Sequence, residues 1–91
     1  MTEYSDGNMP EEYRRRRKQF VEVIAAHGLD GSVRPQTIVL ADGRKFDIEK
    51  HHDPRPAKDA GRPALAYPVW TKGEMTYLFE AGGRWWVLMK Q

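Results

Sequence analysis

The residues best suited to chemistry in this chain are His51, His52 and Asp53, which follow one another directly. Neighbouring residues of an extended chain point to opposite sides, so the two imidazoles would not readily share one metal ion, and the sequence places no further ligand near them. The chain has no cysteine, which excludes a thiolate nucleophile and a cysteine-based zinc site. It also has no phosphate-binding glycine motif and no nucleophile elbow. We therefore predict solvated histidines, no metal or cofactor, and no catalytic activity.

A second group is the basic run at residues 14–18, Arg-Arg-Arg-Arg-Lys. Cations that contact phosphates give salt-sensitive binding to nucleic acid of any sequence. On a helix these five cations spread around the axis, and the acidic pair at residues 11–12 can form ion pairs with Arg15 and Arg16. Two interpretations stay open: a solvated helix face whose arginine stems pack on a sheet, and a phosphate-contacting patch. The patch would consist of Arg14, Arg15, Lys18, Lys58 and Arg62.

A helix is the first element expected to position these groups. Pro10 suits a first helical position, and Gly28 is typical of a helix end. Between them, Tyr13, Phe20 and Ile24 recur at spacings of seven and four, which predicts one apolar helix face. We expect a helix over about residues 10–27, preceded by a mobile tail at residues 1–9.

Strands are expected around three glycines, Gly43, Gly73 and Gly83, each of which lies between runs rich in Val, Ile, Tyr, Phe and Trp. Glycine adopts positive φ without steric cost, so each site predicts a hairpin turn with positive φ at the glycine. The alternation of apolar residues in the first hairpin favours a three-residue loop, and we apply the same rule to the other two. The predicted cross-strand pairs are Ile38 with Phe46, Val69 with Met75, Tyr67 with Tyr77, Phe79 with Trp85, and Tyr77 with Val87.

This register gives the last three strands one wholly apolar face, which includes Trp85 and belongs in the core. The opposite face is half apolar and carries Trp70, Leu78 and Trp86. Two explanations stay open: the helix covers this face, or a partner protein or a second copy of the chain binds it.

The expected architecture is a single α+β domain over residues 10–91. Its helix packs on a five-stranded, bent antiparallel sheet at about residues 33–90, or on a small SH3-like barrel. A long loop over about residues 50–65, which contains three prolines, joins the hairpin to the three-stranded meander. An open antiparallel sheet with the helix on one face is the alternative.

Composition adds limits on function. The chain of 91 residues carries a formal net charge of +2, which permits an anionic partner without requiring one. No apolar run approaches the roughly 20 residues of a membrane span, and the polar, acidic start lacks the features of a signal peptide. We expect a cytoplasmic protein that makes no membrane contact.

Several short motifs carry a resemblance to other proteins. They include Asp42-Gly43-Arg44, Arg55-Pro56-Ala57, Thr76-Tyr77-Leu78-Phe79 and Gly83-Arg84-Trp85-Trp86. The chain resembles in these motifs a group of small uncharacterised bacterial proteins, mainly from Gram-positive organisms, for which no activity is established. The matching residues span about the last 55 positions and are mostly turn and core residues.

The expected function is therefore a non-catalytic binding or adaptor domain that acts through a protein–protein contact. Small barrels of this kind serve mostly as binding modules. Two alternatives stay open: electrostatic nucleic-acid binding through the basic helix, and a self-associating structural protein whose homodimer buries the face of Trp70 and Trp86.

Overall fold

The computed structural model describes residues 17–89, and within that range the regular elements are all β-strands. Each strand is joined to the next by a turn or a short irregular segment. The strands are β1 (Arg17–His27), β2 (Val33–Val39), β3 (Lys45–Asp47), β4 (Lys50–His51), β5 (Arg55–Asp59), β6 (Arg62–Thr71), β7 (Glu74–Ala81) and β8 (Arg84–Met89).

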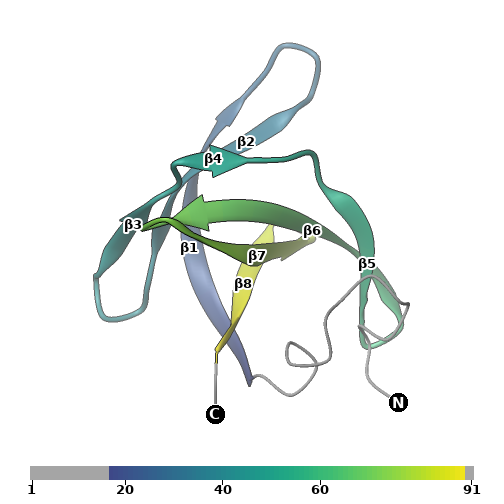
Figure 1. Ribbon diagram of the computed structural model, residues 1–91. Helices are drawn as coiled ribbons and strands as arrows, with labels where there is room; N and C mark the ends of the chain where they lie inside the picture. The colour runs from purple at the N-terminus through teal and green to yellow at the C-terminus, as the bar shows by residue number, and fades with distance from the viewer. Residues whose placement is uncertain (1–16, 90–91) are drawn as a thin grey trace.

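The strands form one antiparallel sheet in the order β3-β2-β1-β8-β7-β6-β4, with β5 also paired to β6. The sheet curls into a half-barrel, with the β1–β2 hairpin rising above the rest (Figure 1). Strand β1 connects the two halves because it changes partner along its length. Its residues 17–21 pair with β8 and its residues 22–27 pair with β2, with a bulge between Ile24 and Ala25.

The predicted α+β class and its N-terminal helix are wrong where the structure describes them, because residues 17–27 form β1. The spacing of four between Phe20 and Ile24 fits one turn of a helix, but it fits two periods of a strand equally well. Val21 and Val23 alternate with them and pack against a buried cluster on the opposite side of β1. β-Branched residues that alternate in this way favour a strand. The expected start of the helix and the tail at residues 1–9 lie outside the described residues.

The turn glycines behave as predicted. Gly43, Gly73 and Gly83 have φ of 90°, 78° and 85°. The first hairpin also has the predicted register, since Ile38 lies opposite Phe46 across a three-residue loop.

The predicted register of the other two hairpins is wrong by one residue. Trp70 lies opposite Met75, and Phe79 lies opposite Trp86. Both turns have two-residue loops in which the residue before the glycine, Lys72 or Gly82, also has positive φ. Positive φ at both central residues is the mark of a type I′ turn, whose twist matches that of the strands.

The predicted long loop over residues 50–65 is also wrong, since that segment contains β4, β5 and the start of β6. Strands β5 and β6 form a hairpin in which Asp59 lies opposite Arg62. Its turn, Ala60-Gly61, repeats the type I′ pattern with φ of 53° and 81°. Pro56 is tolerated because β5 pairs on one side only, with β6, and an edge strand does not need every backbone N–H.

This turn offers a test of the backbone argument. Ala60→Asn should stabilise the domain by roughly 0.5–1 kcal/mol, because asparagine visits the left-handed region at lower cost than alanine. Gly61→Val should destabilise it by roughly 1–3 kcal/mol. A Cβ at Gly61 would meet no atom within 4 Å, so the loss would come from φ alone. Thermal melts of both variants would measure these changes in stability. A Gly61→Val protein more stable than the native chain would contradict the backbone argument.

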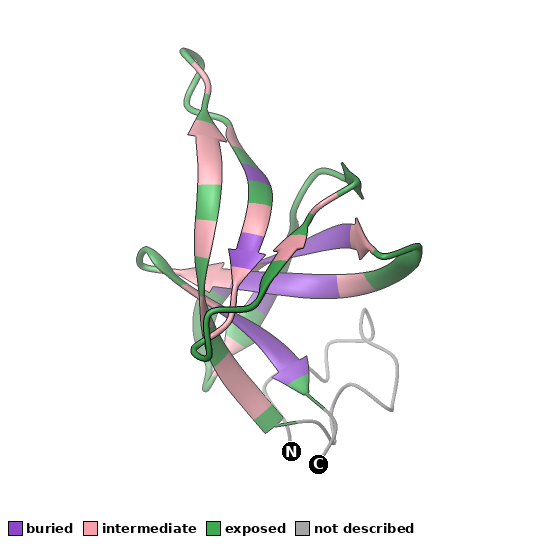
Figure 2. Cartoon of the chain, turned by 90° about the vertical axis from the view of Figure 1, so that its left-hand side faces the viewer, coloured by how far each residue is buried: buried purple, intermediate pink, exposed green. Residues whose placement is uncertain are grey.

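The core lies on both faces of the central strands β6, β7 and β8, which are buried along much of their length (Figure 2). We call the cluster between these strands and β1–β3 the inner cluster, and the cluster on their other face the outer cluster. The buried members of the inner cluster are Ile38, Tyr67, Val69, Leu78 and Val87. Those of the outer cluster are Ala57, Ala64, Ala66, Tyr77, Phe79, Trp86 and Leu88. The predicted division into one wholly apolar core face and one half-apolar face, covered by the helix or by a partner, is therefore wrong.

Candidate functional site

The cations of the predicted phosphate patch are only partly brought together. Arg14 and Arg15 lie outside the described residues. Lys18 donates to Asp59, with its Nζ 2.7 Å from Oδ1, and Nζ also lies 4.4 Å from the centre of the Trp86 ring. Lys18 and Arg62 line one cavity of about 500 Å³. Lys58 is exposed on β5, where it lies opposite Pro63.

Because Arg62 lies opposite Asp59, alternation puts Lys58 on the other face of the β5–β6 hairpin. The described cations therefore do not form one continuous surface. Binding of nucleic acid by this group stays a prediction.

The three predicted apolar contact residues do not share one surface. Leu78 belongs to the inner cluster and Trp86 to the outer cluster, and both are buried. Trp70 is half-buried on β6, with the Lys50 ammonium 6.0 Å from its ring centre. Leu78 and Trp86, which were expected on a docking face, thus lie within the core, because both faces of β7 and β8 are covered.

The histidines lie at the rim of a cavity. His51 and His52 are exposed at the end of β4, and His27 reaches the same cavity from the end of β1. Across residues 17–89, no three His, Cys, Asp or Glu side chains are placed to hold a metal ion. The sequence could not show that His27 lines the same cavity as the other two histidines, since β1 and β4 do not pair and only the curl of the sheet places their ends around one cavity.

This cavity opens at one end of the half-barrel and has a volume of about 820 Å³. It lies between the β1–β2 hairpin, the segment after β4 and the β7–β8 turn, and its deeper wall comes from the inner face of the sheet. The side chains of that wall are Leu65, Tyr67, Glu80 and Trp85. The rim includes His27, Arg34, His51, His52 and Asp53. We call it the open-end cavity.

Strand register places Glu80 in this wall. Glu80 lies opposite Trp85 on β8 and opposite Leu65 on β6, so the three side chains share the inner face. Our predicted register put Glu80 on the other face and so missed it. The dipeptide Gly82-Gly83 was the available signal, because two consecutive glycines favour a two-residue type I′ loop. That loop also fixes the carboxylate, since Gly83 N donates to Glu80 Oε2 over 2.8 Å.

The aromatic part of the wall is a pair of rings, Tyr67 and Trp85, whose centres lie 5.4 Å apart at an angle of 43°. Tyr67 is only 4% exposed. Within the described part of the chain, its hydroxyl has no hydrogen-bond partner. Burial raises the pKa of the Tyr67 phenol, and the charge of Glu80 raises this pKa further. The phenol is therefore neutral at physiological pH and can donate or accept a hydrogen bond.

The raised pKa of Tyr67 predicts a loss of stability at high pH. The unfolded phenol ionises near pH 10, whereas the folded one keeps its proton to higher pH. Its contribution is thus intact below pH 10 and falls as the pH rises above that value. Urea denaturation at pH 8, 10 and 11 should show a shallower alkaline loss for Tyr67→Phe than for the native chain. Parallel losses in the two proteins would contradict the assignment.

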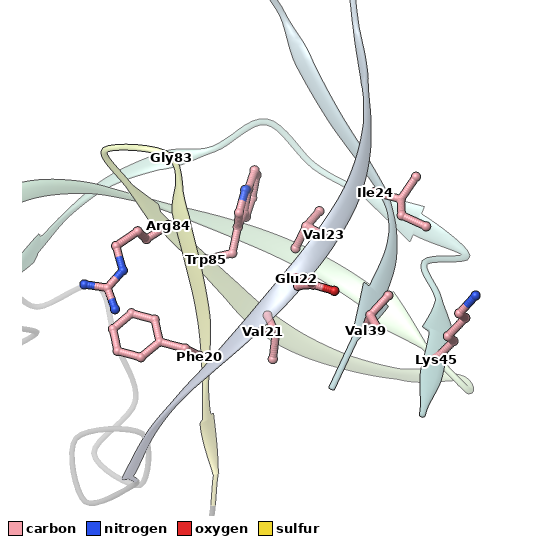
Figure 3. Close-up of a pocket in the computed structure, with 10 residues that line it drawn as sticks. All are labelled: Phe20, Val21, Glu22, Val23, Ile24, Val39, Lys45, Gly83, Arg84 and Trp85. Atoms are coloured by element: carbon pink, nitrogen blue, oxygen red, sulfur yellow. The ribbon is translucent and has the colours of Figure 1, made fainter. Parts of the chain in front are cut away.

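A second cavity, of about 690 Å³, lies beside β1 where that strand leaves β8 (Figure 3). Arg84 extends toward Phe20, with its guanidinium 4.0 Å from the ring centre, while Trp85 leaves β8 on the other side. The last pair between β1 and β8 is Val21 with Trp85. Beyond it, residues 22–27 pair only with β2 among the described strands, which leaves their other edge open.

No protein-family model, curated protein or solved structure matches this chain. The resemblance to the bacterial group therefore stays a prediction, and function has to be argued from the site itself. Within residues 17–89 there is no helix long and apolar enough to cross a membrane.

Proposed function

We propose that this chain is a non-catalytic binding domain that takes up an extended segment of a protein partner. The observation that supports this most directly is the open edge of β1 at residues 22–27, which lies between two cavities. An exposed edge presents backbone N–H and C=O groups to which an incoming strand can pair. Backbone pairing supplies affinity, and pockets for alternate side chains supply specificity.

The surroundings of this edge suit such a segment. His27 at its end lines the open-end cavity, and Val23 in its middle lines the second cavity. Trp85 and Gly83 line both cavities, so a strand laid along β1 would pass beside the same indole. Ile24 is 52% exposed on this strand, although isoleucine is ordinarily buried.

Selection from a random-peptide display library tests this function. Enriched peptides would be titrated into ¹⁵N-labelled protein, where they should shift the amides of residues 22–27 and protect alternate ones from hydrogen exchange. Failure to enrich any peptide, or shifts confined to the outer cluster, would refute the proposal.

A matched pair of variants sharpens the test. Ile24→Lys places a charge on the open edge, a device that blocks strand addition, and should weaken binding by roughly tenfold, equivalent to about 1.4 kcal/mol. Leu29→Lys makes the same change at an exposed residue in the β1–β2 loop and should leave binding unchanged. Equal effects of the two variants would rule out the β1 edge.

A further inference from the structure

Several aromatic rings in this domain are covered by the chain's own cations. The pairs are Lys18 with Trp86 at 4.4 Å, Arg84 with Phe20 at 4.0 Å, Lys72 with Phe46 at 4.8 Å, and Lys50 with Trp70 at 6.0 Å. Each distance runs from the charged group to the ring centre and lies within the range of a cation–π interaction. In residues 17–89, no lysine or arginine covers the Trp85 or Tyr67 ring in this way. The two rings in the wall of the open-end cavity therefore carry no cation of the described chain, and the half-buried Trp85 is the more accessible of the two.

A negative charge lies beside these rings. Glu80 is half-buried and is the cross-strand neighbour of Trp85. Its Oε2 accepts from Gly83, and no cation of the described chain forms an ion pair with it. A carboxylate can accept more than the single hydrogen bond that Gly83 donates. The remaining lone pairs of Glu80 are therefore available to a ligand.

The Tyr67 hydroxyl adds a third polar group. It belongs to a side chain that is only 4% exposed, and among the described residues it has no hydrogen-bond partner. The fully buried side-chain polar atom without a partner in residues 17–89 is Trp70 Nε1, so the Tyr67 hydroxyl is not fully enclosed and is accessible at the cavity. Tyr67 lines the open-end cavity, so a ligand bound there could supply the missing partner.

We propose that the open-end cavity binds a lysine or arginine side chain of the partner segment, held between the Trp85 indole and the Glu80 carboxylate. The Tyr67 hydroxyl then accepts a hydrogen bond from the same ammonium or guanidinium. This specificity rests on the proposed function, because the cation reaches the cavity as part of a segment bound along β1.

The rim also contains one positive group, Arg34, and three histidines whose ring N–H groups can donate hydrogen bonds, which could favour an anionic ligand instead. Arg34 and the histidines are exposed, where water and salt screen the charge of the guanidinium. Glu80 is half-buried, where a charge acts more strongly, and Asp53 adds a second carboxylate at the rim. The balance therefore favours a cation at the aromatic wall, and an anion is kept as an outcome of the test.

Small capped amino acids can test this without knowledge of the partner. Nα-acetyl-arginine amide would be titrated into ¹⁵N-labelled protein and followed at the Trp85 indole N–H. The citrulline analogue has nearly the same shape without the charge, and it should bind about tenfold more weakly, as expected for a partly desolvated cation–π contact. The glutamate analogue should not bind. Equal binding of arginine and citrulline, or stronger binding of glutamate, would overturn the proposal.

Three variants locate the effect. Glu80→Gln removes the charge but keeps an oxygen for Gly83, and Trp85→Leu keeps an apolar side chain without the π face. Both should weaken arginine binding by about tenfold, with thermal melts to confirm that they fold. Glu74→Gln makes the same change as Glu80→Gln at an exposed position at the far end of β7 and should have no effect. Unchanged binding by Glu80→Gln would also overturn the proposal.

These outcomes separate the cation site from the proposed function. If selected peptides bind along β1 and Ile24→Lys blocks them, while the arginine probe does not bind, the binding function is supported and the cation site is refuted. If arginine binds and no peptide is selected, the cavity binds cations but the β1 edge is not a docking site.

Discussion

Replacing Trp86 with alanine should remove a large part of the stability of this domain. Trp86 is 1% exposed at the centre of the outer cluster. Its ring stacks on Phe79 at 5.7 Å and meets Phe20 edge-on at 6.0 Å. Truncation of a buried tryptophan costs about 3–5 kcal/mol, whereas a small domain is held together by only about 5–15 kcal/mol in total. Thermal melts followed by circular dichroism should show the Tm of Trp86→Ala far below that of the native chain.

Trp85 is the natural control, because it is the adjacent residue on the same strand and points to the other face. It is only half-buried beside the open-end cavity, so Trp85→Ala should leave a folded protein with a reduced Tm. This order is the reverse of what the sequence predicted, where Trp85 belonged to the core and Trp86 to the half-apolar face. Equal, mild effects of the two substitutions would contradict the two-sided core.

Leu78→Ala should have the second-largest effect. Leu78 is 0% exposed in the inner cluster, and a buried leucine truncated to alanine costs about 2–5 kcal/mol. Urea denaturation should show the midpoint fall by a corresponding amount. Met75→Ala, on the same strand but exposed, should change stability by less than about 1 kcal/mol.

The same variant tests whether Leu78 contacts a partner, as the sequence predicted. A Leu78→Ala protein that keeps its stability and loses self-association in sedimentation would restore that role. A protein that loses stability instead places Leu78 in the core of the single chain.

The sequence by itself determined three of the turns, those at Gly43, Gly73 and Gly83, although it missed the turn at Ala60-Gly61. Gly43, Gly73 and Gly83 have the predicted positive φ because no other residue adopts it at so little cost. In the first hairpin, the apolar alternation around Ile38 and Phe46 also determined the register. That pattern has one polar face, so a shift by one residue would have exposed the apolar side chains.

Register in the last three strands was not determined in the same way. Strands β7 and β8 carry apolar residues on both faces, and a shift of one residue leaves either face apolar. Positive φ at the glycine is common to both the two-residue and the three-residue loop. Only the tertiary structure, which buries both faces, showed that Phe79 lies opposite Trp86.

Prediction of the candidate site also depended on the register of the last three strands. Tyr67 and Trp85 were predicted on one face, and they line one cavity. The observed register was needed to place Glu80 with them, and the curl of the sheet was needed to place His27 at the rim of the same cavity. The identity of β1 as a strand was likewise decided by tertiary contacts. A spacing of four residues suits a helix and a strand alike, and pairing with β2 and β8 supplies the hydrogen bonds that select the strand.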